Sequence, residues 1–559
     1  MPAARSVVYS AKLIAVCTLV SRVTGLLRDV LLAQAFGLGW IQDAFSYAFQ
    51  FPNLFRRLFG EGAMAPVFVP TFTRTLETEG RESAWRLLAR TLALMTVALA
   101  AVIIVIGLII AGVWALWPGA AEKQPARQLL LALTAIMLPF MLSICVVALL
   151  SSILNCLGSF VPAALTPIVL NAVMIVTLAW LAPRFYPQDP RRQVYVVALA
   201  VVLAGILQVA VLLPALRKRG VPLAWRLEVG DPAVRHMLGL LPPVALGQGV
   251  LAFGVFADAQ ICALLTHVAG TPSDVTVLGW RFAYPLKEGA LSAITYAQRL
   301  YQFPLGVLVI SLATAALPAF SRLAARAQWP EWAAEVRQAL RLAMFEGLLA
   351  GVLMVTLAEP MVRFLFQYGR FTAADTARTS YVVVYYGFGL WAFCAQHIIL
   401  RAFYSLGDVR TPLLISGLFL PINVALTLAL IWVDVIREAA FAISSCTTSI
   451  LSVLIGSLVL QRRVHLRLLD RGLLGSVARM LLTTAAAAGA IAIVRPTWTA
   501  WTDKLGAELL ARGSAVFGLL AVGTAAFVLC ARLLRLPEVA LLLPSRWRRG
   551  PRGPGGDRT

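Results

Sequence analysis

Residues 91–116 read TLALMTVALAAVIIVIGLIIAGVWAL, an apolar stretch without a single charged side chain. About 20 such residues, wound as an α-helix, cross the ~30 Å hydrocarbon core of a bilayer. The chain of 559 residues repeats this pattern, with 60% apolar residues, 13% charged residues and a mean hydropathy of +0.83. A soluble domain has roughly 45–50% apolar and about 25% charged residues. The composition therefore excludes a soluble globular enzyme and predicts an all-α polytopic membrane protein.

Charged, proline and glycine residues divide the apolar sequence into about fourteen predicted membrane-spanning helices. We expect them at residues 10–37, 40–70, 88–117, 128–156, 161–183, 193–216, 237–268, 290–318, 335–366, 379–406, 410–433, 438–461, 474–495 and 511–534. An even number of spans places both termini on one side of the membrane.

The net charge of +22 comes from 48 Lys and Arg against 26 Asp and Glu. The basic residues gather in loops on one predicted side and in the tail 536–559, as the positive-inside rule describes. This distribution predicts a multi-pass membrane protein with cytoplasmic termini, and it argues against a nucleic-acid partner. The seven cysteines lie singly, without the CxxC spacing of a metal site or a disulfide framework.

An internal repeat predicts the architecture. Pro70 in PTFTR is echoed by Pro318 in PAFSR, and Gly158 in LNCLG is echoed by Gly407 in YSLG, at offsets of 248 (318 − 70) and 249 (407 − 158). Two motifs that share one offset indicate a duplicated unit. We expect six-helix lobes at 1–225 and 230–465, related by an axis along the membrane normal, two extra helices within 470–535 and the basic tail. Secondary transporters use this repeat geometry, with the substrate between the lobes.

Charged residues within the predicted spans point to function. They are Arg22, Arg28 and Asp29 in the first span, Asp43, Arg56, Arg57 and Glu61 in the second, and Arg299 in the eighth. A charge at the bilayer centre costs about 2.5–3.5 kcal/mol on insertion scales. These side chains must therefore line a wet cavity or pair with one another.

The excess of arginine over acid favours an anionic ligand. Guanidinium groups bind phosphate oxygens in pairs and stay charged at any relevant pH. We expect Arg22, Arg28, Arg56 and Arg299 to bind a phosphate or diphosphate headgroup.

The remaining intramembrane charges have a second interpretation, as ion pairs that hold helices together. Arg22 and Asp29 lie two turns apart on one helix face, whereas the adjacent Arg28 and Asp29 are expected to point apart. Arg57 is expected to pair with Glu61 at i+4.

These residues resemble those of a known family. The segments SRVTGLLRD (21–29), DAF (43–45), FPNLFRR (51–57), EGA (61–63), FPLG (303–306), FQYGRFT (366–372) and FYSLGD (403–408) are similar, in the same order, to motifs of the MurJ (MviN) lipid II flippases. These flippases belong to the multidrug/oligosaccharidyl-lipid/polysaccharide exporter superfamily. The similarity covers nearly the whole chain.

The resemblance implies fourteen helices, a central cationic cavity and export of lipid II, the undecaprenyl-diphosphate-linked peptidoglycan precursor, by alternating access for cell-wall biogenesis. It places the essential arginines at Arg22, Arg28, Arg56 and Arg299, and gives the two extra helices a groove for the lipid tail. The chain departs from some members at Gln50, Gln298 and Gln302, where they carry a Lys and two acids. Gating through those ion pairs is therefore not expected to be conserved here.

Two further features of the sequence concern coupling and topology. Asp258, within FGVFAD (253–258), is an acid in the seventh span without a basic neighbour in sequence. Such an acid is either a sodium or proton site or a hydrogen-bonded polar residue; the membrane potential is the alternative driving force. The loop between spans seven and eight is about 20 residues longer than the family resemblance leads us to expect. It includes Trp280–Glu288, which we predict to form an interfacial helix.

Several other functions are weighed against this hypothesis. A flippase for another polyprenyl-diphosphate-linked glycan would use the same arginines, and a cation-coupled drug antiporter would need acids without an arginine excess. Neither Walker A, GxSxG nor HExxH occurs, so we expect no enzyme activity, no cofactor and no metal centre. A channel would not require two lobes. We expect a monomer to suffice.

Overall fold

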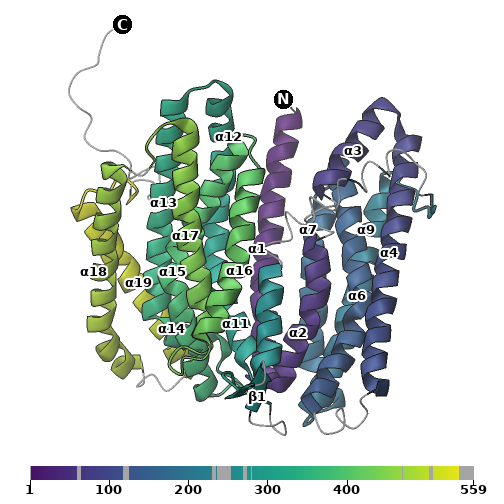
Figure 1. The fold of residues 1–559 in the computed structure, drawn as a ribbon, viewed down its shortest axis with the longest axis horizontal. Coiled ribbons are helices and arrows are strands. Elements are labelled where there is room, and N and C mark those ends of the chain that lie inside the picture. The colour runs from purple at the N-terminus through teal and green to yellow at the C-terminus, as the bar shows by residue number, and fades with distance from the viewer. Residues whose placement is uncertain are drawn as a thin grey trace. The chain divides into compact units, whose positions relative to one another are not determined.

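The computed structural model of the chain is almost entirely helical (Figure 1). It describes residues 2–58, 65–116, 125–228, 235, 239, 253–268, 274–277, 280–468, 470–502 and 508–539. Within these residues the chain forms two compact units. The first unit comprises Met1–Tyr296, Phe366–Asp375 and Asn423–Ala440, and the second comprises Ala297–Leu365, Thr376–Ile422 and Phe441–Thr559.

The first unit is built mainly from the N-terminal helices. These are α1 (Pro2–Phe36), α2 (Trp40–Phe55), α3 (Ala65–Thr78), α4 (Arg81–Leu116), α6 (Pro125–Cys156), α7 (Val161–Val176), which continues through the π-helical η2 (Thr177–Leu181) into α8 (Ala182–Phe185), and α9 (Pro190–Lys218). Helix α6 packs against α2, α4 and α9, and its buried face is the centre of the hydrophobic core. The unit also contains a helix at Phe253–Leu265 and the beginning of α11 (Ala290–Pro304).

The second unit holds most of the remaining helices. They are the end of α11, the π-helical η3 (Leu305–Val309), α12 (Ile310–Ala325), α13 (Trp329–Thr356), α14 (Ala358–Phe366), α15 (Ala373–Ser405), α16 (Arg410–Leu430), α17 (Ala439–Val464), α18 (Arg471–Thr502) and α19 (Glu508–Leu533). Helices α18 and α19 pack against each other and against α13, where Phe345 and Phe527 meet edge to face.

The predicted all-α polytopic class is confirmed. Ten of the described helices are long and apolar enough to cross a membrane, and the bent pair Ala290–Val307 and Ser311–Ala325 adds an eleventh. Of the other predicted spans, 10–37 corresponds to the charged helix α1 and 40–70 to α2 and α3. About half of the predicted span 237–268 lies outside the described residues, and its second half forms the helix Phe253–Leu265.

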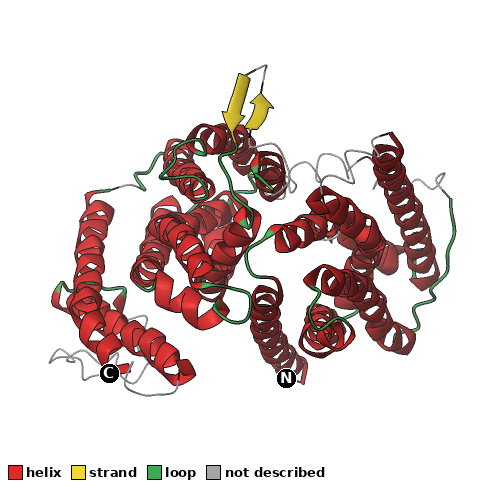
Figure 2. Cartoon of the chain, turned by 90° about the horizontal axis from the view of Figure 1, so that it is seen from below, coloured by secondary structure: helices red, strands yellow, loops and turns green. Residues whose placement is uncertain are grey.

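The predicted interfacial helix at Trp280–Glu288 is wrong. Residues Asp274–Val277 (β1) and Trp280–Ala283 (β2) form an antiparallel two-stranded sheet, and a turn at 288–289 leads into α11 (Figure 2). The run Val275-Thr276-Val277 favours a strand, because β-branched side chains fit the pleated backbone. The ring of Phe282 contacts that of Trp432, with centroids 5.3 Å apart, so the hairpin packs on the segment after α16.

The two repeated glycines occupy the same local structure. Gly158 and Gly407 end α6 and α15 with φ of +70° each. Ser159 N donates to Leu154 O (2.7 Å), and Asp408 N donates to Phe403 O (3.1 Å), so each helix ends with a hydrogen bond from residue i to residue i−5. This is the Schellman geometry, which favours glycine because a Cβ is strained at positive φ. The division into lobes at 1–225 and 230–465 stays a prediction.

Helices α13 and α15 approach closely at glycines. A Cβ on Gly347 would lie 2.6 Å from the Cα of Trp391, and one on Gly351 would lie 2.6 Å from the carbonyl oxygen of Gly387. Gly347 and Gly351 form a GxxxG motif, which allows two membrane helices to pack backbone to backbone.

Gly351→Leu is expected to lower the free energy of unfolding by about 1–3 kcal/mol, because the added side chain forces α13 and α15 apart. Thermal unfolding of the purified protein in detergent measures this loss. Gly107→Leu in α4 is the control, since nothing lies within 4 Å of a Cβ at that position. Equal melting temperatures for the two variants would contradict the close packing.

Candidate functional site

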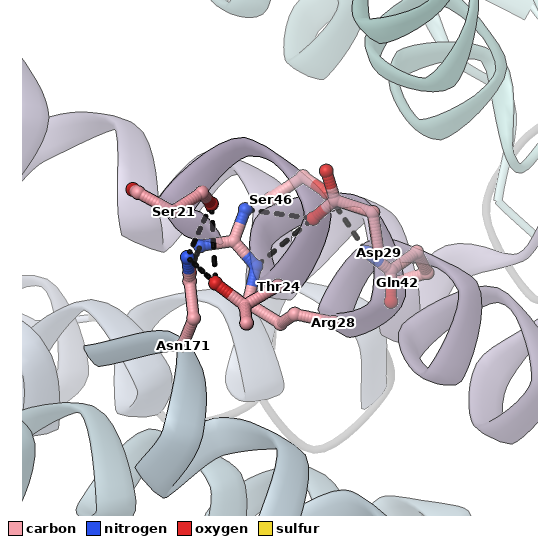
Figure 3. Close-up of polar contacts among 7 residues, drawn as sticks. All are labelled: Ser21, Thr24, Arg28, Asp29, Gln42, Ser46 and Asn171. Atoms are coloured by element: carbon pink, nitrogen blue, oxygen red, sulfur yellow. Dashed lines mark hydrogen bonds and ion pairs between the residues drawn. The ribbon is translucent and has the colours of Figure 1, made fainter. Parts of the chain in front are cut away.

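Arg28 and Asp29, two residues of the predicted site, bond to each other inside the first unit. Arg28 donates from Nε (3.0 Å) and Nη2 (2.7 Å) to Oδ1 of Asp29 (Figure 3). The two residues are 8% and 6% exposed. The expectation that these adjacent side chains point apart is wrong, because the long arginine side chain folds back along the helix to reach its neighbour.

Asn171 of α7 completes this cluster. Its Oδ1 accepts a hydrogen bond from Nη1 of Arg28 (3.1 Å), and its Nδ2 donates to the carbonyl oxygen of Ser21 (3.0 Å) and to Oγ1 of Thr24 (3.1 Å). A Cβ on Gly25 would lie 3.4 Å from Asn171 Nδ2, so glycine gives α7 room to approach α1. Sequence reasoning assigned Asn171 no role in the site. The signal that could have found it is the polar side chain of Asn171 within the apolar predicted span 161–183.

The other first-unit arginines lie nearer the surface of the unit. Arg22 is half-buried on α1. Arg56 is half-buried in the π-helical turn 56–58 that follows Pro52 in α2. Pro52 lacks an N–H and so removes one hydrogen bond from the regular α-helical pattern. π-Helical turns such as 56–58 are frequent at functional sites. Arg57 is exposed, and its predicted partner Glu61 lies outside the described residues.

Asp43 caps the beginning of α11. Its Oδ2 accepts a hydrogen bond from Gly289 N (2.7 Å), and its Oδ1 accepts from Ser292 N (2.9 Å) and Ser292 Oγ (2.5 Å). The carboxylate thereby satisfies backbone N–H groups that have no partner within the helix, at the end where the helix dipole favours negative charge. A Cβ on Gly289 (φ +85°) would lie 2.7 Å from Cβ of Leu38, so only glycine fits this junction.

The C-terminal end of α1 contacts a second distant segment of the first unit. Arg370 N donates to the carbonyl oxygen of Gln34 (2.9 Å), and a Cβ on Gly369 would lie 2.5 Å from the same oxygen. The rings of Tyr296, Phe366 and Phe371 pack together beside these contacts, with centroids 4.9–6.1 Å apart. Segments from both predicted lobes therefore form one compact cluster at this end of α1.

Three predicted residues of α11 lie in the second unit. Gln298 donates from Nε2 to the hydroxyl of Tyr386 (3.1 Å), Arg299 is exposed, and Gln302 is half-buried. The amide of Gln298 thus makes a hydrogen bond to a tyrosine within the second unit. The structure brings Arg28 and Asp29 together in the first unit. Arg299 belongs to the second unit, and its place beside them stays a prediction.

Asp258 lies on the helix Phe253–Leu265, which packs against α2. Tyr47 donates to Oε1 of Gln260 (2.9 Å), and the rings of Phe51 and Phe256 meet edge to face at 5.2 Å. The Asp258 side chain is buried, and its Oδ1 makes no hydrogen bond within the described residues. Among these residues no group of three or more His, Cys, Asp or Glu side chains is placed to hold a metal ion.

Comparison with known proteins identifies the family. The model of the lipid II flippase MurJ family matches residues 32–509. The chain belongs to this family. A probable lipid II flippase MurJ of Rhizobium tropici is 29% identical over 536 residues, which cover 96% of this chain and 95% of the relative. The predicted family is thereby confirmed.

Solved structures share the fold. A lipid II flippase MurJ in an inward closed conformation superposes with a TM-score of 0.71 at 20% identity, covering 93% of this chain and 98% of the other. An inward-facing multidrug resistance transporter of the MATE family and MOP superfamily gives a TM-score of 0.61 at 14% identity, covering 80% and 94%. The family consists of transporters, so the expectation that the chain is not an enzyme agrees with its membership.

Asn171→Ala is expected to lower the free energy of unfolding by about 1–3 kcal/mol, because Arg28 loses a buried acceptor and α1 loses a donor. Chemical or thermal unfolding in detergent measures this loss. Asn155→Ala, at an exposed position in α6, is the matched control and should change stability by less than about 0.5 kcal/mol. A loss no larger than that of the control would show that the cluster does not stabilise the first unit.

Proposed function

We propose that this protein translocates lipid II from the cytoplasmic to the outer leaflet of the bacterial inner membrane. Membership of the flippase family and the arginines within its spans support this proposal. The observation that carries it is the arginine content of the first two predicted spans: α1 holds Arg22 and Arg28, and the π-helical turn after α2 holds Arg56. A diphosphate supplies the negative charge that such a site needs.

Arg22, Arg28 and Arg56 would bind the diphosphate together with Arg299. The guanidinium groups replace the water that solvates the diphosphate, and bind its oxygens in pairs. Asp29 and Asn171 would orient Arg28, and the carboxylate of Asp29 would offset its positive charge when no substrate is bound. The prenyl tail would stay in lipid along α18 and α19 while the headgroup crosses.

Alternating access requires the contacts at the end of α1 to open. Two sets of hydrogen bonds join segments of both predicted lobes there: Asp43 accepts from the beginning of α11, and Gln34 accepts from Arg370. With the termini in the cytoplasm, this end of α1 faces outward, so these bonds would close the outer side. Substrate release would then break them, and the lobes would rock about the binding site. A single copy of the chain contains every part that this cycle uses.

Asp258 would couple transport to a cation. Its buried carboxylate oxygen lacks a hydrogen-bond donor among the described residues, and a bound sodium ion or proton would neutralise it. The inside-negative membrane potential would favour both inward movement of a cation and outward movement of an anion, by about 2.3 kcal/mol per charge per 100 mV.

The proposal predicts that this gene rescues a bacterium depleted of its own lipid II flippase, and that Arg28→Ala and Arg299→Ala abolish rescue. Loss of one hydrogen bond to a charged group, about 1.5–3 kcal/mol, lowers binding roughly ten- to a hundredfold. The measurement is the amount of lipid II that an externally added, lipid II-specific hydrolase can cleave.

Arg191→Ala is the control, because Arg191 is exposed on α9 and donates only to Gln128. Rescue by the Arg28 and Arg299 variants as complete as that by Arg191→Ala would refute the arginine site. No rescue by any form, with normal expression, would point to a different polyprenyl-diphosphate-linked glycan.

Asp258→Asn is expected to abolish stimulation of lipid II translocation by a sodium or proton gradient in proteoliposomes, while leaving the response to membrane potential. Asp189→Asn, at the exposed N-terminus of α9, is the control and should keep the stimulation. Gradient dependence that survives in the Asp258 variant would exclude this residue as the coupling site.

A further inference from the structure

The segment 221–228, VPLAWRLE, exposes three large apolar side chains next to the end of α9. Leu223, Trp225 and Leu227 are 47%, 59% and 54% exposed, although the segment is neither helix nor strand. Clustered apolar side chains of this size mark a surface that contacts a membrane or a partner. The family's transport cycle, as proposed above, does not use this segment.

Bonds at its beginning hold the segment against the first unit. Val221 is 5% exposed. Its N donates to the carbonyl oxygen of Leu216 (3.1 Å), in the last turn of α9. Arg219 donates from Nη1 to the carbonyl oxygen of Leu157 (2.6 Å), at the end of α6. The segment therefore starts at a fixed place beside two helix ends.

An ion pair fixes the other end of the segment at the edge of the membrane. Glu228 accepts hydrogen bonds from Nε and Nη2 of Arg90 in α4. Arg90 is the last charged residue before the uncharged run 91–116. The run is longer than the about 20 residues that the hydrocarbon core requires, so Arg90 lies at or outside the boundary of the core, and its partner Glu228 lies there too.

The charges around the segment are almost all positive. Arg217, Lys218, Arg219 and Arg226 lie within the twelve residues 217–228, where the single acid, Glu228, already pairs with Arg90. Basic side chains beside exposed Trp and Leu match an interface that has anionic headgroups above and acyl chains below.

We infer that residues 221–228 form an interfacial anchor that binds anionic phospholipid. Leu223, Trp225 and Leu227 insert at the boundary between headgroups and acyl chains, and Arg226 with the basic end of α9 binds the headgroup phosphates. On the orientation proposed above, the anchor lies in the cytoplasmic leaflet and fixes the chain between the two predicted lobes to the membrane surface.

Spin labelling of the full-length chain tests this inference. A nitroxide is attached at Trp225→Cys, in nanodiscs of phosphatidylcholine with or without phosphatidylglycerol, and its collisions with oxygen and with a water-soluble nickel chelate are compared. Glu79→Cys, at the exposed turn between α3 and α4, is the water-facing control, and the unsubstituted chain gives the background from native cysteines.

With phosphatidylglycerol, oxygen collisions at position 225 should exceed nickel collisions several-fold, with the order reversed at position 79. Arg226→Glu should move the label at 225 toward water. Nickel access at 225 equal to that at 79 in both lipids would overturn the anchor and leave the surface for a soluble protein partner. Burial that depends neither on phosphatidylglycerol nor on Arg226 would overturn the binding of anionic lipid.

Discussion

A guanidinium group cannot lie against acyl chains without a compensating charge, and this constraint governs the first unit. Arg28 is buried, and it is tolerated because Asp29 accepts two of its hydrogen bonds and Asn171 accepts a third. Arg22 and Arg56, both half-buried, bring two further guanidinium groups into the first two predicted spans. The proposed function follows from these three arginines, which would bind the diphosphate as it crosses the membrane.

Hydrogen bonds to a carboxylate and to a backbone carbonyl join the C-terminal end of α1 and the beginning of α2 to distant segments of the first unit. The carboxylate of Asp43 satisfies the N–H groups at the beginning of α11, and the backbone of Arg370 bonds to that of Gln34. These are hydrogen bonds between elements far apart in sequence, and water or other donors can replace them when they break. Hydrogen bonds that water can replace suit a contact that must open and close repeatedly.

The sequence was sufficient for the helices and for the family, because apolar runs and the motif SRVTGLLRD are local features of the chain. The sequence was insufficient for predicting side-chain contacts, because these depend on how the helices pack against one another. Adjacent position suggested that Arg28 and Asp29 diverge, whereas the flexible arginine stem allows them to meet. Asn171 lies 143 residues from Arg28, and no periodicity predicts such a contact. The segment Trp280–Glu288, which begins with strand β2, was mistaken for a helix because its aromatic residues suit either structure at an interface.

Binding of the diphosphate is the most direct test of the account. The measurement is the rise in melting temperature of the purified protein with undecaprenyl diphosphate, compared with undecaprenyl monophosphate, for the wild type and for a variant with both Arg22→Gln and Arg56→Gln. The account predicts a larger rise with the diphosphate, and loss of that difference in the variant. Equal stabilisation by the two lipids, or an unchanged difference in the variant, would contradict a site built from guanidinium groups for a doubly charged headgroup.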